Sequence, residues 1–265
     1  MFDSNTLKDK VAFITGGTSG INLGIAKGLV SVGARVAVLG RNAEKADAAA
    51  AEIMQEVGDQ AIALTGDVRD PDQVSAALAS CEEQLGKIDI LIAGAAGNFP
   101  APAVAISPKG FKTVIDIDLI GTYNTFHLGF KHLQANASLI AITAPQAVSV
   151  MPFQAHVCAA KAGINMLIKC LAVEWGPAGY RVNGISPGPI EETEGYDRLA
   201  PTEAARTEMV NKLAARRAGV KKDIADAAIY LGAEVSSYVN GTILTVDGGT
   251  ELGDASADCL SVPAR

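Results

Sequence analysis

The sequence predicts an α/β fold in which a single parallel sheet is doubly wound, with helices on both faces. Short apolar runs alternate with longer segments of helical period along almost the whole chain. The runs are apolar at odd and even positions alike, which is typical of parallel strands covered on both sides. No proline- or serine-rich linker interrupts the 265 residues, a length that one α/β domain can reach. We therefore expect one domain over residues 1–265, with a polar and loosely held tail at 250–265.

The order of the apolar runs gives the expected elements. Strands are expected at residues 11–15, 34–40, 61–68, 88–94, 138–144, 180–188 and 241–249. Helices are expected at residues 21–32, 43–57, 71–85, 108–130 and 154–176, and again between the sixth strand and about residue 232. In such a fold, ligands bind beyond the carboxyl ends of the strands, where the strand order reverses.

Composition and charge exclude several classes of protein. The net charge of −7 argues against a nucleic-acid partner, which would require a basic face. Residues 90–108 and 133–160 lack Asp, Glu, Lys and Arg over lengths that suggest membrane spans, but glycines, prolines and amides interrupt both, so we expect no membrane partner. The first ten residues contain no apolar signal core, and we expect a cytoplasmic protein. The cysteines have no close metal-ligand spacing and are expected to be reduced thiols, with no metal bound: Cys81, Cys158, Cys170 and Cys259.

The first expected strand runs into a glycine-rich turn, TGGTSGIN (15–22), that opens a helix. Glycines allow a tight turn and a close approach of the backbone to a pyrophosphate, and the helix N-terminus offers free N–H groups. Strand, glycines and helix together predict a Rossmann-type dinucleotide site, although a tight turn without a ligand uses the same residues. Asn22 stands where a third glycine is usual, so we expect altered phosphate contacts. The expected cofactor contacts in this turn are Gly16, Thr18, Ser19, Gly20 and Asn22.

The second strand ends in Gly40 and Arg41. An acidic residue here would bind the ribose 2′-hydroxyl of NAD, whereas a small residue followed by arginine leaves room for a 2′-phosphate and a guanidinium to bind it. The sequence therefore predicts NADP(H), the alternative being that Arg41 only lies on a solvated loop. Asp67 and Val68, at the end of the third strand, are expected at the edge and face of the adenine.

This layout resembles the short-chain dehydrogenase/reductase superfamily over nearly all of residues 8–250. The matching segments are TGGTSGIN, GDV (66–68), DILIAGAAG (89–97), AAKAG (159–163), RVNGISPGPI (181–190) and DGG (247–249). The resemblance implies that Lys161 holds the nicotinamide ribose and that a homotetramer forms through the helices at 108–130 and 154–176 and the last strand. Further cofactor contacts implied by the resemblance are Gly94, Ala95, Pro187, Gly188 and Ile190.

Three positions depart from the carbonyl-reducing pattern of that family. The tyrosine expected four residues before Lys161 is Val157, the serine thirteen residues before that tyrosine is Ala144, and the asparagine of the helix after the fourth strand is Asp118. Ketone reduction produces an alkoxide that a positioned acid must protonate, and valine is no acid. The cofactor residues are therefore present while the standard carbonyl chemistry is missing.

One branch of the superfamily shares this loss. The segments AAGNF (95–99), DIDLIGT (116–122), LAVEWGP (171–177) and PGPIEETEG (187–195) resemble 2,4-dienoyl-CoA reductases, particularly the peroxisomal type. That type also lacks the tyrosine and has residues matching Asp118 and His156, but it has an aspartate where this chain has Asn165. The resemblance implies reduction of a conjugated C=C bond in a fatty acyl-CoA, with Asn98, Phe99 and His156 near the substrate.

This chemistry suits the residues that remain. Hydride addition to a conjugated thioester puts negative charge on the thioester oxygen, which Lys161 and backbone N–H groups would stabilise. Asp118 would hold a water or orient Lys161 through one, so these two residues are the catalytic candidates, although Asp118 also fits a structural role and His156 a buried structural one. Two alternatives remain: a carbonyl reductase with a displaced acid such as His156, and an NADP-binding protein without catalytic activity.

Overall fold

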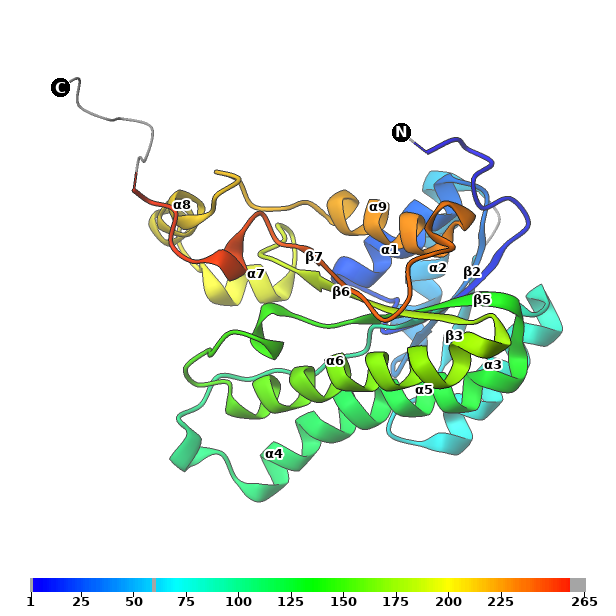
Figure 1. The fold of residues 1–265 in the computed structure, drawn as a ribbon, viewed down its shortest axis with the longest axis horizontal. Coiled ribbons are helices and arrows are strands. Elements are labelled where there is room, and N and C mark those ends of the chain that lie inside the picture. The colour runs from blue at the N-terminus through cyan, green and yellow to red at the C-terminus, as the bar shows by residue number, and fades with distance from the viewer. Residues whose placement is uncertain (1, 59–60, 258–265) are drawn as a thin grey trace.

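A computed structural model describes residues 2–58 and 61–257. All seven strands found in this part of the chain lie in one parallel sheet with the order β3-β2-β1-β4-β5-β6-β7 (Figure 1). The strands are β1 (Val11–Thr15), β2 (Arg35–Gly40), β3 (Ala61–Thr65), β4 (Ile88–Ala93), β5 (Leu133–Ile142), β6 (Arg181–Pro187) and β7 (Ile243–Val246). The doubly wound α/β prediction is confirmed. The order reverses between β1 and β4, which places a ligand crevice at the carboxyl ends of these two strands.

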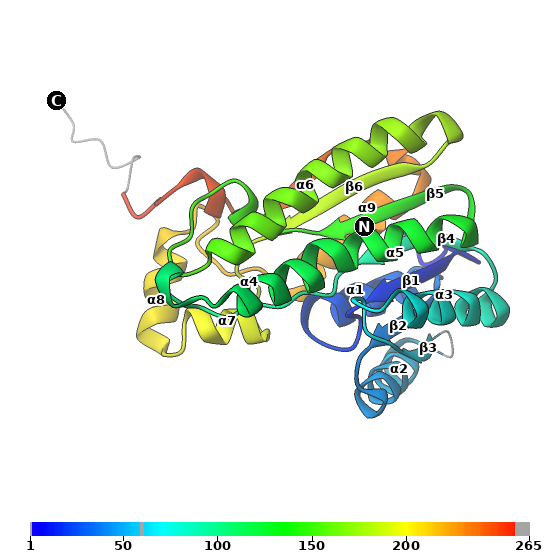
Figure 2. The same cartoon turned by 90° about the horizontal axis from the view of Figure 1, so that it is seen from below.

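Helices cover both faces of the sheet, and each face has its own apolar core (Figure 2). On one face lie α1 (Gly20–Ser31), α2 (Ala43–Val57) and α9 (Lys221–Gly232). The other face is covered by α3 (Pro71–Leu85), α5 (Gly121–Gly129) and α6 (Ala155–Trp175). Because β1 sends Ile14 into the first core and Phe13 into the second, the central strand is apolar on both of its faces.

The remaining helices lie around the carboxyl ends of the strands. They are α4 (Pro108–Ile115), α7 (Glu194–Leu199) and α8 (Glu203–Lys212). Between α4 and α5 the chain forms a π-helix at Asp116–Ile120, so the helix expected at 108–130 is continuous but changes its winding. Single π-turns inside helices are frequent at functional sites, and this one contains Asp118.

Three strands differ clearly in length from the sequence prediction. β7 covers only Ile243–Val246 rather than 241–249. β5 begins at Leu133 rather than at 138, with an irregularity in its pairing to β4 between Ile88 and Ile90. β3 ends at Thr65 rather than at 68, because the Gly66 N–H makes the last bond to β2, on Gly40 O, and the chain then turns at Asp67 towards α3. The extra apolar residue, Val68, is buried from that turn, which explains why it looked like part of a strand.

Among the described residues, Ala155–Ala178 is the only segment long and apolar enough to cross a membrane. Core helices of soluble proteins pass the same test, and α6 packs against β6 and α4. At the other end of the chain, residues 250–252 form a 3-10 helix, and Ala255 N–H donates to Lys212 O over 2.9 Å. The expected loose tail thus makes defined contacts as far as its described part extends, while residues 258–265, Cys259 among them, lie outside the described residues.

Candidate active site

The glycine-rich turn is fixed against the end of β4. Gly16 and Gly20 have φ angles of 70° and 56°, which favour glycine. A Cβ on Gly16 would lie 2.9 Å from the Ala95 backbone, so the two strand ends nearly touch. Thr15 Oγ1 accepts the Gly94 N–H over 3.1 Å. The turn therefore presents its backbone at the crevice, as a pyrophosphate site requires.

Asn22 replaces the third glycine without opening the turn. Its Nδ2 donates to Gly94 O over 2.8 Å, and a Cβ on Gly94 would lie 2.5 Å from Asn22 Oδ1. The side chain thus joins α1 to the end of β4 directly, and its Oδ1 is buried with no hydrogen-bond partner among the described residues. The structure places Ser19 at the N-cap of α1 with no side-chain cap bond, which leaves its hydroxyl exposed beside the turn.

Arg41 is exposed at the end of β2, beyond Gly40. A Cβ on Gly40 would lie 2.5 Å from Thr18 Cγ2, so Thr18 fills the place that a larger residue at 40 would need. Asp67 forms an ion pair with Arg69, and this hydrogen bond, with a smaller attraction from Arg41, lowers the pKa of the Asp67 carboxyl. No ion pair of Arg41 occurs in residues 2–58 and 61–257, which leaves its guanidinium available for an anionic group.

Val68 follows Asp67 in the turn between β3 and α3. A Cβ on Gly121 would lie 2.6 Å from Val68 Cγ2, so the valine packs against the start of α5. Its carbonyl accepts from Asn124 Nδ2 over 2.9 Å. The Val68 side chain is 5% exposed and packed into the core, and its place beside an adenine stays a prediction.

The centre of the site is a buried ion pair. Lys161 Nζ lies 3.2 Å from Asp118 Oδ2 and donates to Ile142 O over 3.1 Å. Asp118 Oδ1 accepts the Gly97 N–H over 2.7 Å, which links the pair to the loop after β4. The two side chains are 7% and 1% exposed, so each charge depends on the other. The carboxylate contacts the lysine directly, whereas the sequence suggested contact through a water.

The positions of the missing acid and serine contain no polar side chain. Val157 is buried and packs with Val114 and Ala160 in a small cluster of its own. Ala144 precedes a short 3-10 helix, Pro145–Ala147. No other described tyrosine or serine forms a hydrogen bond to Lys161 or Asp118. The arrangement can hold and polarise a substrate but offers no phenolic acid at the usual place.

His156 lies beside this pair in an aromatic setting. Its ring centroid is 4.3 Å from that of Phe99 and 6.5 Å from that of Phe111, and the residue is fully buried. Neither ring nitrogen has a hydrogen bond of normal geometry to a described residue. Burial lowers the pKa of His156, and the Phe99 backbone and the Asp118 carboxylate oppose this only in part. The imidazole is therefore neutral at pH 7, and it packs against the loop that carries Asn98.

The residues after β6 form the far wall of the crevice. A Cβ on Gly188 would lie 2.6 Å from the Asp247 backbone, so this glycine is required by a close approach. Pro187 ends β6, and Ile190 forms a bridge to Gly219 with its side chain buried. The side chains of Pro187 and Ile190 are thus buried, whereas Gly188 and Pro189 are partly exposed, and the place of this segment along a carboxamide stays a prediction.

Three partners in the site were not found from the sequence. Thr15 holds Gly94, Gly97 holds Asp118, and Thr193 donates to Ile190 O over 2.6 Å while it caps α7. Thr15 lies at the last position of β1 and Thr193 precedes a helix, which are signals for a strand end and an N-cap. Asn165, the position of the absent acid, accepts from Thr143 Oγ1 over 2.7 Å.

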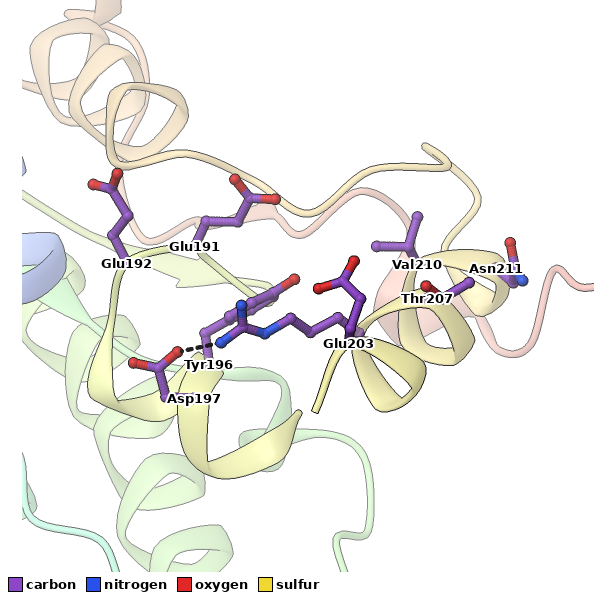
Figure 3. Close-up of a pocket in the computed structure, with 9 residues that line it drawn as sticks. Glu191, Glu192, Tyr196, Asp197, Glu203, Thr207, Val210 and Asn211 are labelled. Atoms are coloured by element: carbon purple, nitrogen blue, oxygen red, sulfur yellow. Dashed lines mark hydrogen bonds and ion pairs between the residues drawn. The ribbon is translucent and has the colours of Figure 1, made fainter. Parts of the chain in front are cut away.

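An acidic cavity of about 520 Å³ lies beside α7 and α8 (Figure 3). Tyr196 points into it, and burial together with the nearby Glu191 raises the pKa of its phenol. Arg206, which forms an ion pair with Asp197 over 3.0 Å, lies 5.5 Å from the centroid of the Tyr196 ring. This cavity carries the wrong charge for an acyl-CoA phosphate. Basic side chains on the helices and loops around this end of the sheet form ion pairs within the protein: Lys112, Arg198, Arg206, Lys212, Arg217, Lys221 and Lys222.

Comparison with known proteins places this geometry in a family. Residues 16–251 match the family described as Enoyl-(Acyl carrier protein) reductase. The chain belongs to the short-chain dehydrogenase/reductase family. It is thus an oxidoreductase with a nicotinamide cofactor, and the exposed backbone of the glycine-rich turn fits the pyrophosphate of such a group.

Sequence identity to two named enzymes indicates which type of oxidoreductase the chain resembles. The chain is 43% identical to the peroxisomal 2,4-dienoyl-CoA reductase of Saccharomyces cerevisiae over 246 residues, 91% of this chain and 84% of that protein. It is 39% identical to the Danio rerio enzyme of the same name over 260 residues, 97% and 86% of the two chains. Both are named as producers of (3E)-enoyl-CoA. The resemblance to 2,4-dienoyl-CoA reductases is therefore confirmed.

Solved structures show the same fold. A short chain dehydrogenase from Bacillus anthracis superposes with a TM-score of 0.82 at 37% identity, covering 92% of this chain and 97% of that one. A short-chain type dehydrogenase/reductase from Mycobacterium marinum gives a TM-score of 0.84 at 29% identity, covering 92% and 96%.

Proposed function

We propose that this oxidoreductase uses NADPH to reduce a conjugated C=C bond of a 2,4-dienoyl-CoA thioester. The observation that carries the proposal is the buried Lys161–Asp118 pair in a site whose tyrosine position is filled by Val157. A carbonyl reductase would need an acid at that position. A conjugated thioester needs instead a positive group and N–H donors for the charge that develops on its oxygen.

NADPH, when bound, supplies the hydride that adds to the diene carbon furthest from the thioester. Electrons then move along the conjugated chain to the thioester oxygen, and a proton is added at carbon 2, giving a 3-enoyl-CoA and NADP⁺. Lys161 provides the positive charge near the nicotinamide ribose. Asp118 holds that lysine on one oxygen and the Gly97 N–H on the other, so it positions the loop against which the substrate lies.

The preference for NADP(H) is supported by the exposed guanidinium of Arg41 beside Gly40, which has no ion pair within the described part of the chain. A 2′-phosphate would form charge-assisted hydrogen bonds with it. Neither Gly40 nor Thr18 carries a carboxylate that would compete for the guanidinium, and Asp67 is already bonded to Arg69.

A homotetramer is part of the proposal. Apolar side chains are exposed along the outer faces of α5, α6 and the π-turn: Ile120, Tyr123, Phe130, Met166 and Val173. Exposed apolar surface on two neighbouring helices is typical of an interface between subunits. A cytoplasmic location remains a proposal supported only by the sequence composition.

The test is oxidation of NADPH with a panel of 2,4-hexadienoyl-CoA, 2,4-decadienoyl-CoA, a 2-enoyl-CoA and simple ketones. We expect turnover of the dienoyl thioesters, with a 3-enoyl-CoA as product by chromatography against standards. The proposal fails if ketones are reduced and no dienoyl-CoA is. Cofactor binding without turnover of any substrate would favour the non-catalytic alternative.

A further inference from the structure

Four apolar side chains extend into solvent at the mouth of the candidate active site. We call them the apolar lip: Val104, which is 99% exposed, and Val148, Val150 and Phe153, at 68%, 92% and 58%. Val104 lies in a short 3-10 helix, Ala103–Ala105, and the others lie in the loop between β5 and α6. The loops before α4 and α6 lie at the same end of the molecule as α7 and α8 (Figures 1 and 2).

The lip is continuous with the site. Ala101 N–H donates to Phe153 O over 2.9 Å, which joins the two loops that carry the lip. Two residues before Ala101, the half-buried ring of Phe99 packs on His156. Apolar surface thus runs outward from the buried imidazole, across Phe99, to Phe153 and its neighbours.

Phe153 is held in a conformation that is unfavourable in two respects. Its φ angle is 66°, a left-handed conformation that is strained for a residue other than glycine. Its ring is also largely in water, so the apolar area gains nothing from burial in the isolated chain. Strained backbone positions are found most often at active sites and ligand-binding loops.

The surroundings of the lip determine what it can bind. Residues 90–108 and 133–155 contain no Asp, Glu, Lys or Arg. The one guanidinium that the structure shows bonded to the first of these segments, that of Arg198 on Asn98 O, is already paired with Glu194. A flexible hydrocarbon needs only apolar contact. We propose that the apolar lip is the subsite for the distal part of the fatty acyl chain, so that the protein selects longer acyl-CoA chains over short ones. This inference rests on the proposed acyl-CoA substrate.

The expected size follows from methylene burial. Complete burial of one methylene strengthens binding about fourfold. Four additional methylenes that are half covered by the lip therefore give about a 15-fold preference for decanoyl-CoA over hexanoyl-CoA. Phe153 provides the largest side chain of the lip, and its removal should reduce that preference about fivefold.

The experiment measures the dissociation constants of saturated hexanoyl- and decanoyl-CoA by calorimetry in the presence of NADP⁺, so it does not require turnover. The variants are Phe153→Gly and Val150→Ser. Glycine accepts a φ of 66° without strain, so Phe153→Gly should fold, and Val150→Ser keeps the backbone of Phe153. Tyr238→Ser is the matched control, because Tyr238 is 102% exposed in the connection between α9 and β7.

We expect both lip variants to lower the ratio of decanoyl to hexanoyl affinity and the control to leave it unchanged. An unchanged ratio, or an equal loss for both ligands, overturns the subsite. A change in oligomeric state by light scattering with an unchanged ratio would instead identify an interface between copies, and loss of vesicle binding would identify a membrane contact. A wild type that prefers decanoyl-CoA yet reduces no dienoyl-CoA would refute the proposed reaction while supporting the subsite.

Discussion

Replacing Asp118 by asparagine tests whether the ion pair in the site behaves as one unit. The asparagine side chain would keep an oxygen for the Gly97 N–H while it removes the charge 3.2 Å from Lys161 Nζ. At an effective dielectric constant of about 20, two unit charges at this distance attract by about 5 kcal/mol. Removing one partner of a buried pair generally costs about 3–5 kcal/mol, because the other charge stays desolvated. We therefore expect Asp118→Asn to lower the free energy of unfolding by about 3 kcal/mol.

The measurement is a double-mutant cycle with Lys161→Met in urea, followed by the fluorescence of Trp175, the only tryptophan of the chain. Each single variant leaves an unpaired buried charge, and the double variant leaves none. The double variant should thus be more stable than the sum of the single losses predicts, by at least about 1.5 kcal/mol. Losses that add to within about 0.5 kcal/mol would refute the coupling. In kinetic assays Asp118→Asn should lower kcat more than it weakens NADPH binding, since the carboxylate contacts the lysine and the substrate loop.

Three further changes test the rest of the site. Arg41→Asp should shift preference from NADPH towards NADH, measured by the two dissociation constants, and equal affinity of the wild type for both cofactors would contradict the role of Arg41. Burial lowers the pKa of His156 in the folded protein from its ordinary value of 6.5, so below pH 6.5 the unfolded chain binds a proton that the folded chain does not. Stability should therefore fall as the pH falls below 6.5, and thermal denaturation at several pH values should show a smaller slope for His156→Gln. Val157→Tyr should lower the free energy of unfolding by about 1–3 kcal/mol, because the larger side chain must enter the cluster with Val114 and Ala160. The same variant should not reduce ketones rapidly, and rapid ketone reduction would show that the pocket is already shaped for carbonyls.

The sequence was sufficient for the fold, and it singled out Lys161 and Asp118, which the structure brings into contact. Alternation of apolar runs with helical segments requires only periodicity, and every expected strand is found with its core in place. The glycines of the turn and the lysine of α6 are recognisable because backbone geometry and charge restrict them to one residue type. Asp118 was found for a similar reason, since a charged residue replaces an amide there.

What the sequence could not give depends on contacts between distant segments. Asn22 looked like a changed phosphate contact, and its bond to Gly94 requires two strand ends to be placed first. The packing of Val68 against Gly121 likewise requires the turn after β3 and the start of α5 to be placed first. The direct contact of Asp118 with Lys161 depends on a π-turn, and a local change in helix winding leaves apolar periodicity almost intact over so few residues.

The π-turn at Asp116–Ile120 changes the direction in which α5 faces relative to α4, although the two helices are continuous. An inserted residue rotates everything on one side of it by about 100° relative to the other, since each helical residue advances by that angle. The same continuous helix consequently faces two different neighbours: its first half packs against α6 at the site, and its second half packs against α3. Asp118 lies in the π-turn between these two contacts. The direction of its carboxylate therefore depends on how the α4–α6 contact is oriented relative to the α3–α5 contact. A substitution in the contact between α3 and α5 would therefore change the direction of the Asp118 carboxylate relative to Lys161, although no residue of the site itself is replaced.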